Sequence, residues 1–190
     1  MIKRILILFA IAQLSMMGYS QTPKWAEKAK KAVFSVVTYD ANDKILNTGN
    51  GFFISEKGVA ISDYALFKNA QRAVIITSEG EKMPVKAILG ANDMYDVVKF
   101  SVDITSKKVA NLTLSETPMT EGTKLWLLPY STQKVRSLTS GNVNSVDKIS
   151  DYAYYTINLP LKEKMVSCPL MNDEGLVVAL AQKASGQDTA

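Results

Sequence analysis

The chain has 190 residues, of which 47% are hydrophobic and 21% are charged, so it can bury a core and is not globally disordered. It contains no histidine and one cysteine, Cys168, which excludes an internal disulfide and any metal cluster built on imidazole or on several thiolates. The net charge is +4, and no basic stripe with interleaved aromatic residues indicates nucleic-acid binding.

The N-terminus has the layout of a secretory signal peptide. Lys3 and Arg4 give a positive start, residues 5–17 are largely apolar, and small residues precede Gln21. The apolar run is too short to span a bilayer comfortably, which disfavours the alternative of an uncleaved membrane anchor. We therefore expect residues 1–20 to be removed on export to the periplasm or the cell exterior, with no other membrane association. Removal leaves 20 basic and 18 acidic residues, a net charge of +2.

A short helix is predicted at the start of the mature domain, which spans residues 21–190. Thr22 can serve as the N-cap, Pro23 suits the first turn, and good helix formers continue to Ala32.

Beyond Ala32 the pattern changes to short apolar runs separated by turn residues, which is typical of strands. Their regular spacing predicts an all-β sandwich or barrel. A break near Lys107 to Leu112 divides the domain into lobes at residues 33–106 and 112–190. The predicted strands cover residues 33–40, 45–55, 59–66, 72–78, 82–90, 96–103, 112–116, 124–130, 135–148, 152–160 and 176–184.

Five motifs follow one another in order: GNGFFISEKGVAISD, GANDMYDVVKFSVD, EGTKLWLLPY, SLTSGNVNSV and SCPLMNDEGLVVAL. In this order they resemble the trypsin-like serine proteases of the chymotrypsin fold, and most closely their bacterial HtrA-type branch. The resemblance implies two antiparallel β-barrels with the active site in the cleft between them. The family also has a strand after the segment that matches residues 176–184, so we expect an incomplete second barrel with an unpaired edge.

The resemblance places the family's catalytic histidine at Ala65, its aspartate at Asp96 and its serine at Val166. Ser167 and Cys168 then fall on the two glycines that follow the serine. Since the chain has no histidine, it lacks the base that activates the serine in this family. The loop is also free of glycine, so the backbone donors of the oxyanion hole are expected to be lost. The resemblance therefore implies a degenerate protease homologue with no catalytic residues.

Two alternatives remain for these residues. Ser167 or Cys168 could be the nucleophile of a working hydrolase, with Lys162 or Lys164 as an unusual base, although the polar sequence LKEKM is typical of solvated lysines and Cys168 suits packing. Asp96 could be a relic acid, a turn residue, or a buried carboxylate bonded to backbone amides.

Three tyrosines lie together in the segment DYAYYTI. Strand alternation directs Tyr152 and Tyr154 to one face and Tyr155 to the other. They could bind a peptide at a groove, or they could pack between sheet and loop. We expect extended peptides or another protein as partners, captured by strand addition, and neither cofactor nor metal. Trp126 is expected in the core, and ANDK and NDEG are predicted to be hairpin turns rather than calcium loops.

Overall fold

The computed structural model describes residues 22–105, 107–131, 138–149, 152–159, 161–162 and 165–182, so the predicted signal peptide lies outside the described residues. No helix within these ranges is long and apolar enough to cross a membrane. The elements are, in chain order, α2 (Ala26–Ala32), β1 (Val33–Tyr39), β2 (Ile45–Phe53), β3 (Val59–Ser62), the 3-10 helix η1 (Tyr64–Leu66), β4 (Arg72–Ile76), β5 (Lys82–Asn92), β6 (Val97–Val102), β7 (Lys124–Leu127), β8 (Thr139–Ile149), β9 (Tyr152–Ile157), β10 (Pro169–Met171) and β11 (Val177–Leu180).

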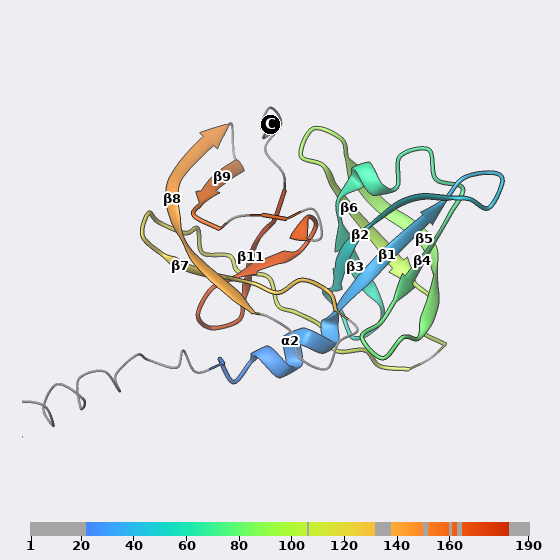
Figure 1. The fold of residues 1–190 in the computed structure, drawn as a ribbon, viewed down its shortest axis with the longest axis horizontal. Coiled ribbons are helices and arrows are strands. Elements are labelled where there is room, and N and C mark those ends of the chain that lie inside the picture. The colour runs from blue at the N-terminus through green and yellow to red at the C-terminus, as the bar shows by residue number, and fades with distance from the viewer. Residues whose placement is uncertain are drawn as a thin grey trace, which may run out of the picture.

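The first lobe is a closed antiparallel barrel with the strand order β1-β2-β3-β6-β5-β4 (Figure 1). Apolar residues alternate along its strands and face its interior. Along β6, for example, Val98, Phe100 and Val102 are buried, while Lys99 between them is exposed. Aromatic rings from three strands meet inside the barrel, since Phe34 contacts both Phe53 and Phe100.

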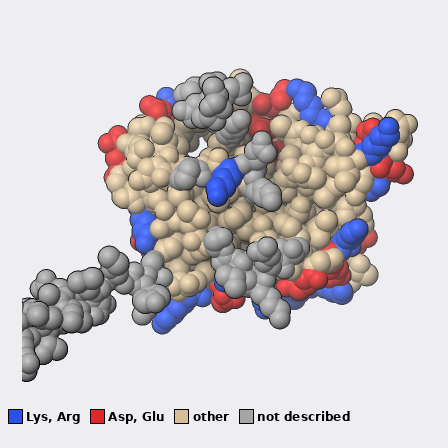
Figure 2. Space-filling view, viewed as in Figure 1, with Lys and Arg blue, Asp and Glu red and all other residues tan. Residues whose placement is uncertain are grey.

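The second lobe is an open, curled antiparallel sheet with the strand order β11-β10-β7-β8-β9 (Figure 1). Its buried residues include Leu125 and Leu127 of β7 and Leu170 of β10. The prediction of an all-β fold made of two barrel-like lobes is therefore confirmed, and the second lobe is only a half-barrel among the described residues. On the face shown in Figure 2, the charged groups of the described residues lie mainly toward the rim, and one basic group lies near the middle.

The segment between β6 and β7 crosses from the first lobe to the second. It first follows the barrel, where the Val109 N–H donates to Glu56 and the Leu112 N–H donates to Phe53. It then reaches the second sheet, where the Ser115 N–H donates to the carbonyl of Val177. Leu112 is buried in a cluster shared by both lobes.

The N-terminal helix packs against the second lobe through two tryptophans. The indole N–H of Trp25 donates to the Asp173 carbonyl at 2.8 Å, and the buried Trp126 donates to an Asp173 carboxylate oxygen at 2.6 Å. The two rings meet edge to face, with centroids 6.2 Å apart. Gly175, at φ +78°, completes the turn beside Trp25.

Three local predictions are wrong. The helix begins at Ala26, because the chain first makes a turn in which the Ala26 N–H donates to Pro23, so Thr22 is not its cap. Residues 112–116 do not form a strand and make only an isolated bridge, between Leu114 and Val177. No strand is predicted from the sequence where β10 forms, because three residues are too few to show alternation.

Candidate functional site

Segments of both lobes meet at the positions that the resemblance assigns to catalysis. Residues 63–65 follow β3, residues 95–96 precede β6, and residues 166–168 precede β10. These three segments are called the interlobe site below. Side-chain and backbone hydrogen bonds join them, so residues more than 100 positions apart in the chain lie in contact.

Asp96 and Ala65 are in direct contact. A carboxylate oxygen of Asp96 accepts the backbone N–H of Ala65 at 2.6 Å, and the Asp96 carbonyl accepts the N–H of Tyr64 at 3.3 Å. Asp96 is half-buried and has φ +49°. Asp96 lies in the turn before β6 and its carboxylate accepts a backbone amide, so it combines features of the turn residue and of the amide-bonded carboxylate. Ala65 is exposed and carries only a methyl group, which cannot accept a proton.

The buried centre of the site is a hydrogen bond between the lobes that joins Ser167 and Asp63. The Ser167 hydroxyl donates to a carboxylate oxygen of Asp63 at 2.7 Å, and the two residues are 0% and 3% exposed. Ser167 has φ +64°, and its own N–H donates to the carbonyl of Ala181 at 2.8 Å. Hydrogen bonds therefore hold both the hydroxyl and the backbone N–H of Ser167, and its side chain is shielded from solvent.

Burial raises the pKa of Asp63 from 3.8 to about 7, because the charged carboxylate loses its hydration. The hydrogen bond from Ser167 opposes this increase, the negative charge of Asp96 adds to it, and the nearby Gln182 amide lowers it slightly. The second carboxylate oxygen of Asp63 accepts no hydrogen bond within the described part of the chain. Asp63 is thus a carboxyl group whose neutral form the site favours.

Val166 is held to the first lobe through its backbone. The side-chain amide of Asn50, on β2, donates to the Val166 carbonyl at 2.6 Å, while its oxygen accepts the N–H of Tyr130 at 3.0 Å. Asn50 is 4% exposed, so these bonds form away from water. The isopropyl group of Val166 offers no nucleophile at the position of the family's serine.

Cys168 lies in the core of the second lobe. It is fully buried and clusters with Leu127, Leu170 and Ala181. Burial raises the pKa of its thiol, because the thiolate would lose its hydration there. The thiol therefore stays protonated and unreactive at neutral pH.

The lysines suggested as bases do not supply one within the described residues. Lys162 is exposed, whereas Lys164 lies outside the described residues together with Glu163. The predicted loss of the oxyanion hole concerns the loop that contains Glu163 and Lys164. That part of the prediction therefore also lies outside the described residues. Ser167 instead bonds Asp63, a residue that the sequence analysis did not single out.

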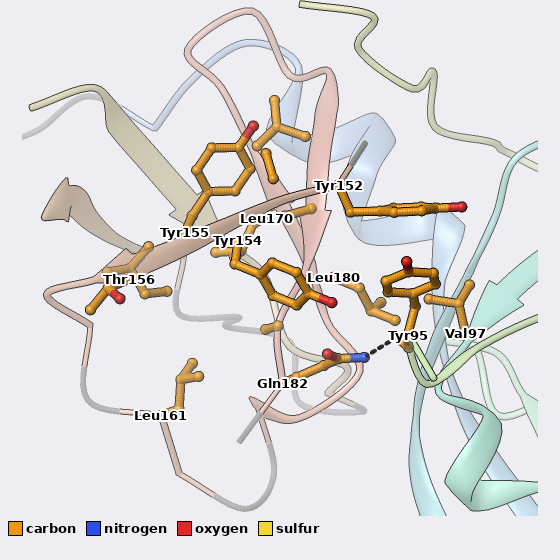
Figure 3. Close-up of a pocket in the computed structure, with 15 residues that line it drawn as sticks. Tyr95, Val97, Tyr152, Tyr154, Tyr155, Thr156, Leu161, Leu170, Leu180 and Gln182 are labelled. Carbon is orange, nitrogen blue, oxygen red and sulfur yellow. Dashed lines mark hydrogen bonds between the residues drawn. The ribbon is translucent and has the colours of Figure 1, made fainter. Parts of the chain in front are cut away.

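A cavity of about 520 Å³ lies beside the interlobe site, lined mostly by the second lobe and also by Tyr95 and Val97 of the first (Figure 3). All three tyrosines of β9 contribute to its lining. Tyr152, 48% exposed, stacks on Tyr95 of the first lobe with ring centroids 3.7 Å apart. Tyr154 points toward Leu180 in Figure 3, whereas Tyr155 points the other way, and its hydroxyl accepts the N–H of Met119.

Gln182 connects the cavity to the interlobe site. Its amide donates to the carbonyls of Tyr95 and Asp96, each at 3.1 Å (Figure 3). Sequence reasoning missed Gln182, Asn50 and Asp63. For two of them the sequence offers only a positional hint of a role: Asp63 directly follows an apolar strand, and Asn50 lies between two glycines in GNG. No three acidic or cysteine side chains in the described ranges are grouped to hold a metal ion.

This geometry agrees with a comparison against known families. The chain matches the model of the trypsin-like peptidase domain over residues 49–180, which is more than half of its length. The chain belongs to the trypsin-like peptidase family. No curated protein gives a significant match. The matched range contains all three segments of the interlobe site.

Proposed function

We propose that this trypsin-like domain is exported and binds an extended peptide or another protein without cutting it. The observation that carries the proposal is the absence of histidine from the whole sequence. In the family, histidine takes the proton from the serine, and without a base the hydroxyl is a poor nucleophile.

The surroundings of the family's three catalytic positions support the same conclusion. The position of the base carries the methyl group of Ala65, and the carboxylate of Asp96 is bonded to the backbone there. The position of the nucleophile carries Val166, whose carbonyl is tied to Asn50. The Asn50 bond holds Val166 to the first lobe, and the Asp96 bond joins two segments within the first lobe, so both contacts support a structural role for these positions.

A binding role is supported by what the domain exposes. Among the described residues the second sheet ends at β9 and β11, and exposed edges can capture extended peptides by strand addition. Tyr152 and Tyr154 line the cavity of about 520 Å³ and are 48% and 38% exposed. Tyrosines are frequent anchors in protein interfaces.

One observation favours the alternative of an active hydrolase. Ser167 donates to Asp63 at 2.7 Å, and the pKa of Asp63, about 7, would suit a general base at neutral pH. Both residues are buried, however, so a substrate carbonyl cannot approach the serine oxygen without opening the interface between the lobes. We therefore favour a role for this pair in holding the lobes together.

Covalent labelling separates the two functions. The purified native chain is incubated with a serine-directed fluorophosphonate and, separately, with iodoacetamide, and the adducts are counted by intact-mass spectrometry. We expect no fluorophosphonate adduct, and an iodoacetamide adduct only after unfolding in urea. Ser167→Ala and Cys168→Ala serve as matched variants. A native adduct that disappears in one of them would support the hydrolase.

Export is tested by secretion. The layout of residues 1–20 supports cleavage before Gln21. We expect the chain made in a bacterial host to appear in the periplasm with a mass that begins at Gln21. Replacing Lys3 and Arg4 by glutamate should retain the uncleaved chain in the cytoplasm. Recovery of the full-length chain from membranes would instead indicate an anchor.

A further inference from the structure

Strand β5 leaves its neighbour β4 partway along its length. The ladder between the two strands has three residue pairs and ends where Val74 faces Pro84. Proline has no backbone N–H, so it cannot act as a donor in this ladder. Beyond Pro84, β5 has two bulges in its pairing with β6, the first of them directly after Val85, and bulges bend the strand that carries them. The separation lies on the side of the barrel that faces away from the second lobe (Figure 1).

The rest of β5 is a long edge that has a partner on one side. From Val85 to Asn92 the strand pairs with β6 alone among the described residues. All seven residues from Lys86 to Asn92 are exposed, and Ile88 and Leu89 are 50% and 52% exposed. Proteins usually protect such an edge with charges, prolines or a covering segment, whereas this stretch carries a single charge. An exposed and mainly apolar edge of this length indicates a surface for another polypeptide.

A groove lies beside this edge, where β4 and β5 separate. It has a volume of about 270 Å³ and is lined by residues 67 and 70–73 on one side and by residues 85–88 on the other. Phe67, Val85 and Ile88 contribute apolar walls. The volume is below the range of about 300–1,000 Å³ that is typical of sites for whole small molecules. The groove therefore suits side chains of an extended segment that lies along β5.

The charges at the groove favour an acidic occupant. Its lining contains the cations of Arg72 and Lys86 and no acidic side chain of the described chain. Arg72 is already paired, because its Nε donates to a carboxylate oxygen of Asp43 at 2.7 Å and its guanidinium lies over the ring of Tyr39. Lys86 forms no ion pair among the described residues. A carboxylate beside Lys86 would complement its charge.

A second copy of the chain would not supply this carboxylate through the same edge. The edge has the sequence VKAILGAN, which contains Lys86 and no acidic residue. Two copies that paired edge to edge would therefore bring together two lysines and no carboxylate. A different segment that carries acidic residues matches the edge better than the edge matches itself.

We propose that the free edge of β5 and the adjoining groove, together called the β5 edge site, bind an extended segment of a partner protein. The segment pairs with β5 by strand addition, places apolar side chains in the groove and brings a carboxylate to Lys86. The proposal rests on the proposed binding function, and it adds a site on the first lobe and the chemistry of the partner that this site takes.

The probe is a fluorescent peptide with the sequence SEVEIEVS, in which acidic and apolar residues alternate. Its binding to the purified chain is measured by fluorescence anisotropy. In one control peptide, SKVKIKVS, lysines replace the glutamates. In the other control all inner backbone amides of the probe are N-methylated, so that it has no donors for the edge. We expect saturable binding of the probe, weakened about tenfold or more in either control.

Matched protein variants locate the binding. Lys86→Glu should weaken binding of SEVEIEVS about tenfold and strengthen binding of SKVKIKVS by a similar factor. Lys28→Glu makes the same change of charge at an exposed residue of α2 and should alter neither. Ile88→Asp should also weaken binding of the probe, whereas Met94→Asp, at a residue that is 80% exposed after the end of β5, should not. Thermal unfolding shows whether each variant folds, and if Ile88→Asp does not fold, Lys86→Glu still gives the test.

Each of the other outcomes contradicts a part of the proposal. Absence of probe binding, equal binding of the two peptides, or equal effects of Lys86→Glu and Lys28→Glu would overturn the β5 edge site. Unchanged binding of the N-methylated peptide would overturn strand addition. A dimer in sedimentation velocity that Ile88→Asp dissociates would assign the edge to a second copy instead of a partner. The non-catalytic function is tested separately by labelling of Ser167 and Cys168, so its failure is distinguishable from failure of this site.

Discussion

The buried pair of Asp63 and Ser167 makes the stability of this domain depend on pH in a defined direction. Asp63 has a pKa of about 7 in the folded chain and 3.8 as the ordinary value. At 1.36 kcal/mol per pKa unit, this difference corresponds to at most about 4 kcal/mol. Because the folded state holds the Asp63 proton more tightly, the contribution of this carboxyl group to stability is fully present below about pH 4. It is lost as the pH rises toward 7.

Asp63→Asn isolates this contribution. The amide is neutral at every pH, has nearly the same volume, and keeps an oxygen that can accept the Ser167 hydroxyl. Urea unfolding of both proteins between pH 4 and 8.5 gives their free energies of unfolding. We expect the wild type to lose up to about 4 kcal/mol relative to Asp63→Asn over this range. Taking the difference between the proteins cancels the titration of the other carboxylates.

Two further variants sharpen the test. Asp93→Asn changes an exposed carboxylate and should leave the pH profile of the wild type unaltered. Ser167→Ala removes the hydrogen bond that lowers the pKa of Asp63, so the loss of stability should extend to higher pH. A difference between wild type and Asp63→Asn that stays constant with pH, or that grows in favour of the wild type at high pH, would refute the reasoning.

Three more outcomes follow from single contacts. Asn50→Ala should cost about 2–4 kcal/mol of unfolding free energy, because the half-buried Val166 carbonyl and Tyr130 N–H both lose this partner. A loss no larger than that of exposed Asn42→Ala would contradict it. Gly175→Ala should lower the unfolding free energy by about 1–3 kcal/mol more than Gly80→Ala does in the same assay. Both glycines have positive φ, but only at Gly175 would a Cβ meet another side chain, that of Trp25 at 2.5 Å. Cys168 should react with a disulfide reagent at pH 8 only after unfolding, and rapid reaction of the native chain would disprove its burial.

The fold could be predicted from the sequence because strand alternation and ordered motifs are local signals. The alternation in β6 is readable directly, since every second residue is apolar and buried. The short strand β10 escaped this method because its burial comes from packing on β7 and β11, which no three-residue pattern encodes. Residues 112–116 look like a strand, but they divide their bonds between the lobes. Leu112 bonds Phe53 of the barrel, whereas only Thr113, Leu114 and Ser115 reach β11.

The candidate site was predictable only where the family motif fixes positions. The contact of Asp96 with Ala65 lies where the motif places it. The bond between Ser167 and Asp63 could not be read from the sequence, because a single polar residue after a strand is indistinguishable from a turn residue. Gln182 was missed for the same reason, since its partners are backbone carbonyls of the other lobe.

Hydrolysis of fluorogenic casein by the purified, protease-free wild-type chain tests the central claim most directly. Attack on a peptide bond requires an accessible nucleophile with a base within about 3 Å. The only serine hydroxyl at the interlobe site donates to a buried carboxylate. We predict that hydrolysis between pH 5 and 9 equals that of the Ser167→Ala and Cys168→Ala variants, at the buffer background. Turnover by the wild type that either substitution abolishes would contradict the account.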